Sequence, residues 1–185
     1  MNSNAVRIRV SDEGDHDRIL AVHRNAFGDD QGPVIASLVA EMLDDPTGEP
    51  IFSFIAELAD QLVGHVLFTS VTLQSNSEGR AQILAPLAVT GDQQGQGIGG
   101  RLVKEGFARL IEAEVKLVFV LGSPDYYSRF GFVTAGIRGF QAPYPIPPKN
   151  ADAWMVTELS PGGIEQNEGT VRCSKALSHP QYWQE

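Results

Sequence analysis

The segment that most constrains this 185-residue chain is an apolar run, Leu84–Val89, that leads into a glycine-rich loop. The loop has glycines at positions 91, 95, 97, 99 and 100, and apolar spacing predicts that a long amphipathic helix begins inside it at Ile98. A strand followed by such a loop and helix directs unpaired backbone N–H groups, and the positive end of the helix dipole, at one point. The sequence therefore predicts a site for a phosphate or pyrophosphate.

Three alternatives for this loop differ in the context that each requires. Gly95, Gly97 and Gly100 satisfy the dinucleotide pattern G-x-G-x-x-G, but that pattern belongs to a parallel strand–helix–strand unit, whereas the strands predicted before this loop are antiparallel. A nucleotide P-loop needs Gly-Lys followed by Ser or Thr, and Gly99-Gly100-Arg101 does not supply it. The remaining alternative is a tight turn without a ligand.

The spacing of apolar residues predicts one domain in which helices and strands alternate in blocks. The runs between residues 52 and 89 are joined by short turns and should form antiparallel strands. A break at Gly28–Pro33 is expected to separate two N-terminal helices, and the tail is expected to fray toward Glu185. The predicted strands are 6–10, 52–58, 62–73, 81–89, 115–121, 153–159, 169–174 and one from Phe132 onward; the predicted helices are 19–27, 34–43, 98–113 and 124–130.

Composition limits the compartment and the partners. The formal net charge of -9 argues against a nucleic-acid surface and suits cationic small molecules or peptides better. Cys173 is the single cysteine, so an internal disulfide and a multi-cysteine zinc site are excluded, and no metal is expected. No apolar run reaches the length of a signal peptide or a membrane span. These features predict a cytoplasmic protein that does not use a membrane.

Two motifs carry a resemblance to a known family. Gln94-Gly95-Gln96-Gly97-Ile98-Gly99 resembles the Q/R-x-x-G-x-G/A signature of the GCN5-related N-acetyltransferases (GNAT). The segment Val120–Phe132 is similar to the following strand and short helix of that family, which end in Tyr-x-x-x-Gly-Phe. The order and separation of the motifs also match, and the run Gly122–Tyr127 is most similar to the bacterial YhbS-type subgroup.

The resemblance implies a fold and a cosubstrate. The implied fold is α/β (α+β), with a mixed, mostly antiparallel central sheet, a strand–helix–strand core that binds acetyl-CoA, and helices on both faces. The implied boundaries are a single domain over 1–185, with the acetyltransferase core at 6–145 and C-terminal strands and a tail at 146–185. The implied donor-binding residues are Leu87, Ala88, Val89, Gln94, Gly95, Gln96, Gly97, Ile98 and Gly99, together with the neighbouring Gly100 and Arg101.

The resemblance also implies how an acetyl group is transferred. In this resemblance Tyr127 occupies the family's general-acid position. A phenol suits the role because it is protonated at neutral pH and can protonate a departing thiolate. The adjacent Tyr126 is the alternative. A strand bulge beside Pro86 would free backbone N–H groups for the thioester carbonyl. Glu57 is the candidate general base, ahead of His65. Cys173 has no His or Asp nearby in the sequence, which argues against a covalent cysteine mechanism.

The predicted function is therefore an N-acetyltransferase that uses acetyl-CoA and an amine of a small molecule or peptide. The alternative is a non-catalytic acyl-CoA-binding regulatory domain. The acceptor is expected to bind among the N-terminal helices and the 139–149 segment, but no motif identifies it. A homodimer through the C-terminal strands is an option that nothing in the sequence requires.

Overall fold

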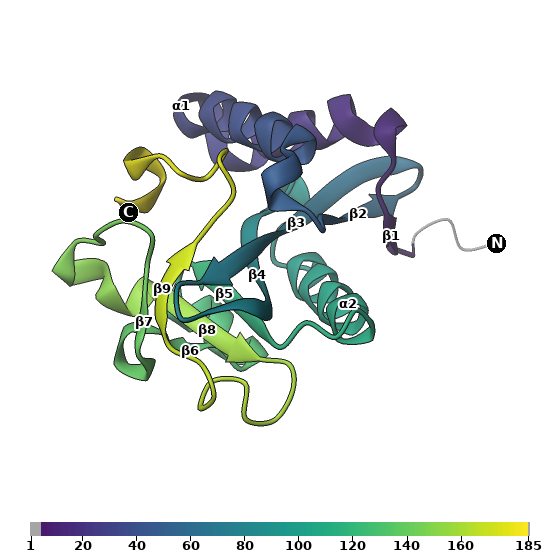
Figure 1. Cartoon of the computed structure of the whole chain (residues 1–185). Coiled ribbons are helices and arrows are strands. Elements are labelled where there is room, and N and C mark those ends of the chain that lie inside the picture. The colour runs from purple at the N-terminus through teal and green to yellow at the C-terminus, as the bar shows by residue number, and fades with distance from the viewer. Residues whose placement is uncertain (1–4, 185) are drawn as a thin grey trace.

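The computed structural model describes residues 5–184, apart from the side chains of residues 76–79. Within these residues one sheet runs in the order β1-β2-β3-β4-β5-β8-β6, and β9 pairs with both β3 and β7 (Figure 1). All neighbours are antiparallel except β4 with β5 and β7 with β9. The strands are β1 (Arg7–Val10), β2 (Phe52–Leu58), β3 (Gln61–Leu73), β4 (Asn76–Val89), β5 (Leu117–Leu121), β6 (Val133–Thr134), β7 (Phe140–Gln141), β8 (Trp154–Glu158) and β9 (Gly169–Arg172).

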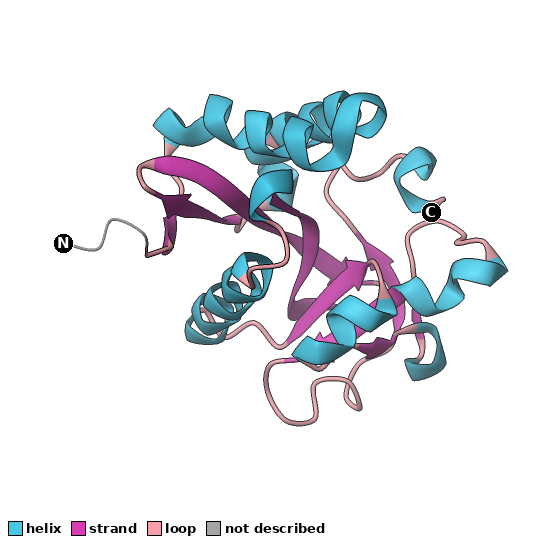
Figure 2. Ribbon diagram, turned by 180° about the vertical axis from the view of Figure 1, so that it is seen from behind, coloured by secondary structure: helices cyan, strands magenta, loops and turns pink. Residues whose placement is uncertain are grey.

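Two helices cover opposite faces of the sheet, α1 (His16–Asp44) on one and α2 (Ile98–Glu112) on the other (Figure 2). The alternation of side chains along β3 creates both cores. Leu67 packs into the core under α1, whereas Val66 and Phe68 pack into the core under α2. A third helix, α3 (Pro124–Tyr127), follows β5 and continues as a 3-10 turn to Phe130.

Helix α1 consists of the two predicted N-terminal helices, which meet at a sharp bend at Gly28. Only Gly28, with φ of 74°, leaves helical geometry, and the helix resumes at once and includes Pro33. The predicted break between two helices is therefore confirmed, but it is confined to Gly28 and does not extend to Pro33. A glycine is needed at 28 because side chains disfavour this backbone conformation.

Strand β4 separates from β5 at the centre of the molecule. The parallel pairing ends at Leu84 and Val120, while β4 continues to Val89. On the other edge of β4, the register against β3 shifts so that Ala85 and Pro86 oppose one residue, a β-bulge. The bulge and the divergence open a gap between the two central strands.

The C-terminal tail is folded, contrary to the expectation that it frays. Trp183 is 2% exposed, its ring lies 5.7 Å from that of Trp154, and its Nε1 donates to the carbonyl of Leu177 at 2.9 Å. Figure 1 shows this yellow segment beside the end of α1. The burial of two large aromatic surfaces explains why so polar a tail is ordered.

Candidate active site

The glycine loop has the conformation that its composition predicts. Gly95 and Gly97 have φ of 76° and 81°, and a Cβ added to either would meet no atom within 4 Å. Gly97 caps α2, and the first bond of that helix runs from the N–H of Arg101 to the Gly97 carbonyl at 3.1 Å. The amides of residues 98–100 therefore have no partner in the helix.

A cavity of about 490 Å³ lies over these amides, and we call it the loop cavity. It is bounded by the glycine loop, the end of β4 and the α3 turn. Its lining residues are Leu87, Val89, Gln93, Gln94, Gly95, Gly97, Ile98, Gly99, Gly100, Tyr126, Tyr127, Arg129 and Phe130.

The end of β4 adds two more backbone donors. The N–H of Thr90 donates to the carbonyl of Val63 on β3 at 2.9 Å. Because alternate residues of a strand direct their amides to opposite edges, the amides of Leu87 and Val89 point away from β3. They face the side that β5 has left, and the Val89 carbonyl accepts from Gln94 Nε2 at 2.9 Å.

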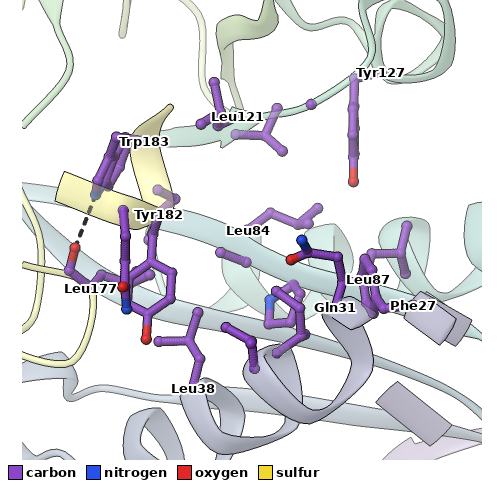
Figure 3. Close-up of a pocket in the computed structure, with 18 residues that line it drawn as sticks. Phe27, Gln31, Leu38, Leu84, Leu87, Leu121, Tyr127, Leu177, Tyr182 and Trp183 are labelled. Carbon is purple, nitrogen blue, oxygen red and sulfur yellow. Dashed lines mark hydrogen bonds between the residues drawn. The ribbon is translucent and has the colours of Figure 1, made fainter. Parts of the chain in front are cut away.

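A second cavity, also about 490 Å³, lies between β4, β5, α1 and the C-terminal tail (Figure 3). We call it the inner cavity. Its lining residues are Phe27, Gln31, Val34, Ile35, Leu38, Ile83, Leu84, Ala85, Pro86, Leu87, Val120, Leu121, Gly122, Tyr127, Leu177, Gln181, Tyr182 and Trp183. Leu87 and Tyr127 line both cavities, so the two meet there.

Tyr127 and Tyr126 differ in placement. The Tyr127 ring packs against Gly122, where an added Cβ would be 2.5 Å from its Cε2, and Figure 3 shows the hydroxyl pointing into the inner cavity. Burial raises the pKa of Tyr127 above its usual range. Tyr126 lines only the loop cavity, with its hydroxyl over Gly99 and the Arg129 guanidinium 4.4 Å from its ring centre.

Most, but not all, of the predicted donor-binding residues line the loop cavity. Ala88 shares the orientation of Thr90, with its amide directed toward β3. Gln96 and Arg101 are not among the lining residues, and the Arg101 guanidinium instead donates to the carbonyl of Val6 at 2.9 Å.

Glu57 lies apart from both cavities. Its carboxylate accepts two hydrogen bonds from the guanidinium of Arg9, at 2.9 and 3.2 Å, and lies 3.6 Å from that of Arg18. Arg9 also holds the buried Asp15 carboxylate at 2.7 and 2.9 Å. The hydrogen bonds from Arg9 lower the pKa of Glu57, which makes its carboxylate a weaker base.

His65 belongs to a buried polar chain on the α1 side of the sheet. His65 Nδ1 lies 2.8 Å from His23 Nε2, and His65 Nε2 lies 2.9 Å from the Ser53 hydroxyl, which accepts from Ser11 at 2.6 Å. Both rings are fully buried, and the His23 ring stacks on Phe27 of the inner cavity. Neither histidine is among the lining residues of either cavity.

From the sequence, none of the cavity-lining residues on the tail was identified, and α1 was expected to contribute only as a whole segment. The acceptor was expected among the N-terminal helices and residues 139–149, but the described lining contains Leu177, Gln181, Tyr182 and Trp183 and nothing from that second segment. The apolar spacing of Val34, Ile35 and Leu38 was a usable signal for α1. Cys173 lies outside the lining of both cavities, and burial raises the pKa of its thiol to about 12, which keeps it protonated at neutral pH.

These observations agree with the family comparison. Residues 7–135 match the model of the acetyltransferase (GNAT) domain, so the chain belongs to the GNAT acetyltransferase family. The resemblance read from the two motifs and the fold it implied are therefore confirmed. No helix of residues 5–184 is both long and apolar enough to cross a membrane.

Individual relatives cover nearly the whole chain. The uncharacterized N-acetyltransferase YjhQ of Escherichia coli K12 is 38% identical over 167 residues, 89% of this chain and 90% of its own length. The crystal structure of E. coli YhbS, an N-acetyltransferase in complex with CoA, superposes with a TM-score of 0.84 at 28% identity, covering 95% of this chain and 93% of the other. A GNAT acetyltransferase from Brucella melitensis in complex with acetyl-CoA gives a TM-score of 0.68 at 27% identity, covering 94% and 99%.

Proposed function

We propose that this protein is an acetyl-CoA-dependent N-acetyltransferase in which an amine attacks the thioester directly. The observation that carries the proposal is the junction at Tyr127, where a cavity over free backbone amides meets a second cavity able to hold an acceptor. Family membership and the CoA-bound relatives support the choice of donor.

In this proposal the pyrophosphate of acetyl-CoA binds to the amides around Gly95–Gly100 at the positive end of α2. The free amides of Leu87 and Val89 bind the pantetheine arm and polarise the thioester carbonyl. Ala88, Gln96 and Arg101 flank this donor site, and their contacts with acetyl-CoA stay predictions.

The reaction balances with Tyr127 as general acid. The amine nitrogen attacks the carbonyl carbon and a C–N bond forms; the C–S bond then breaks and the sulfur leaves with the phenol proton. The proton lost by the amine restores the phenol. Because burial raises the pKa of Tyr127, its hydroxyl is protonated across the neutral range.

Other predictions are supported less directly. Glu57 as general base stays a prediction, and its pairing with Arg9 makes the role difficult to fulfil. A cytoplasmic location and a homodimer also stay predictions.

Calorimetric titration with acetyl-CoA tests the proposal, with free CoA, NAD and ATP as controls. Saturable binding of acetyl-CoA and CoA alone is the expected result. Absence of acetyl-CoA binding, or tighter binding of NAD, would overturn the assignment of the loop cavity. Binding without turnover of any amine would favour the non-catalytic acyl-CoA-binding domain instead.

A further inference from the structure

The inner cavity differs in character from the acidic protein that contains it. The chain has a formal net charge of -9, yet no Asp, Glu, Lys or Arg of the described chain is among the residues that line this cavity. Its polar side chains are Gln31, Tyr127, Gln181 and Tyr182, and the remaining lining is apolar or glycine. The carboxylates of Asp15 and Glu57, which lie near the start of α1, are paired with Arg9 rather than facing the cavity.

This lining penalises a charged acceptor. An ammonium or carboxylate that enters this cavity loses part of its hydration and finds no opposite charge among the lining residues to replace it. A diamine would bring a second ammonium, and an amino acid would bring a carboxylate. The cationic partners that the net charge favours are therefore poorly suited to this cavity.

The same surroundings assist the reacting amine. Desolvation disfavours the charged form of an amine and lowers its pKa, so a nitrogen held beside Leu84 and Leu87 is driven toward the neutral, nucleophilic form. Transfer then does not require a carboxylate base in the cavity.

The shape of the wall indicates the body of the acceptor. Phe27 and Tyr182 present partly exposed aromatic rings. Trp183 is 2% exposed and its N–H already donates to the Leu177 carbonyl, so it closes the wall as a packed apolar ring. Figure 3 shows the Gln31 carboxamide opposite Tyr127, on the α1 side of the cavity. Aromatic ligands gain from ring contacts as well as from burial.

We propose that the acceptor is a primary amine on an uncharged, apolar body, with arylalkylamines as the class that fits best. The inference rests on the proposed acetyltransferase function and adds its substrate class. A cavity of about 490 Å³ is within the range of small-molecule sites and holds one ring with a short aminoalkyl chain.

The test compares matched amines in a CoA-release assay after acetyl-CoA binding has been established by calorimetry. 2-Phenylethylamine is paired with L-phenylalanine, which adds a carboxylate, and with L-phenylalaninamide, which adds a neutral group at the same position. Hexylamine is paired with 1,6-diaminohexane. We expect kcat/KM to be at least about 100-fold lower for each charged member, and phenylalaninamide to lie closer to phenylethylamine than to phenylalanine.

A variant moves the preference in a defined direction. Val34 lines the inner cavity and is 45% exposed, so Val34→Asp places a carboxylate at its wall without burying it fully. We expect this variant to shift the ratio of diaminohexane to hexylamine kcat/KM upward by about tenfold or more. Ile137→Asp is the matched control, because Ile137 is 80% exposed and outside the cavity lining.

The possible failures are distinguishable. If acetyl-CoA does not bind, the proposed function falls and the inference falls with it. If acetyl-CoA binds but the charged amines are acetylated as well as or better than the apolar ones, or neither apolar amine is acetylated, only the substrate class is overturned.

Discussion

The buried pair His23–His65 makes a strong prediction about the pH dependence of stability. Burial lowers the pKa of His23 from 6.5 to about 4, and burial together with the neighbouring His23 lowers the pKa of His65 well below its usual range. The geometry adds a second reason. With both rings protonated, two N–H donors would face each other across the 2.8 Å between His23 Nε2 and His65 Nδ1.

The direction in which stability changes with pH follows from which state, folded or unfolded, binds protons first. As the pH falls below the unfolded value of 6.5, the unfolded chain takes up protons that the folded chain cannot, so stability is lost from about pH 7 toward pH 4. For His23, with its pKa lowered from 6.5 to about 4, the loss between pH 7 and pH 5 is about 2 kcal/mol, and His65 adds a loss of the same sign. Arg9 lowers the pKa values of Asp15 and Glu57. These two carboxylates therefore add to the loss of stability mainly as the pH falls below their ordinary pKa values of 3.8 and 4.5.

The measurement is the free energy of unfolding in urea at pH 7, 6 and 5. The variant is His23→Gln/His65→Gln, which replaces two titrating rings by neutral polar side chains, and His179→Gln at an exposed position is the control. The double variant is expected to be less stable at pH 7 but to lose little further stability by pH 5, while the control keeps the slope of the parent protein. A double variant with the parent's slope would refute the reasoning, since the pH dependence would then arise elsewhere.

Three further substitutions test the site and its walls. Tyr127→Phe should reduce kcat about 100-fold or more and leave the dissociation constant of acetyl-CoA nearly unchanged. Tyr126→Phe should affect turnover much less. Equal loss of binding and turnover in Tyr127→Phe would remove the general-acid role. Gly97→Ala forces a side chain into a backbone with φ of 81°. It should cost about 1 kcal/mol of stability, measured by urea unfolding, and should weaken acetyl-CoA binding, measured by calorimetry. Gly136→Ala, with open space around it, should cost little of either. Trp183→Ala should cost about 3–5 kcal/mol and raise KM for the acceptor, and an unchanged melting temperature would mean that the tail is not part of the folded core.

Local patterns predicted the central elements well. β2 spans the predicted residues, and α2 and β5 lie within a residue or two of theirs, because apolar spacing reports directly on which face of an element is buried. The glycine loop was also readable, since positive φ at Gly95 and Gly97 favours glycine whatever lies around it. Two short motifs were enough to identify the family because their residues act through backbone geometry that is local in the sequence.

Other features depended on contacts between distant segments. The ordering of the tail rests on Trp183 meeting Trp154, and the position of Glu57 rests on Arg9 reaching it from the neighbouring strand. Neither contact leaves a signal in the local sequence, because the partners lie far apart along the chain.

The sequence by itself determined the family, and it also located the glycine loop and the candidate acid, because each depends on a few adjacent residues. Only the tertiary structure decided the inner cavity, which we propose holds the acceptor. Its walls come from α1, β4, β5 and the C-terminal tail, and its apolar character appears only when these segments are brought together. The physical reason is that a binding cavity is a property of packed surfaces, whereas a glycine loop is a property of the local backbone.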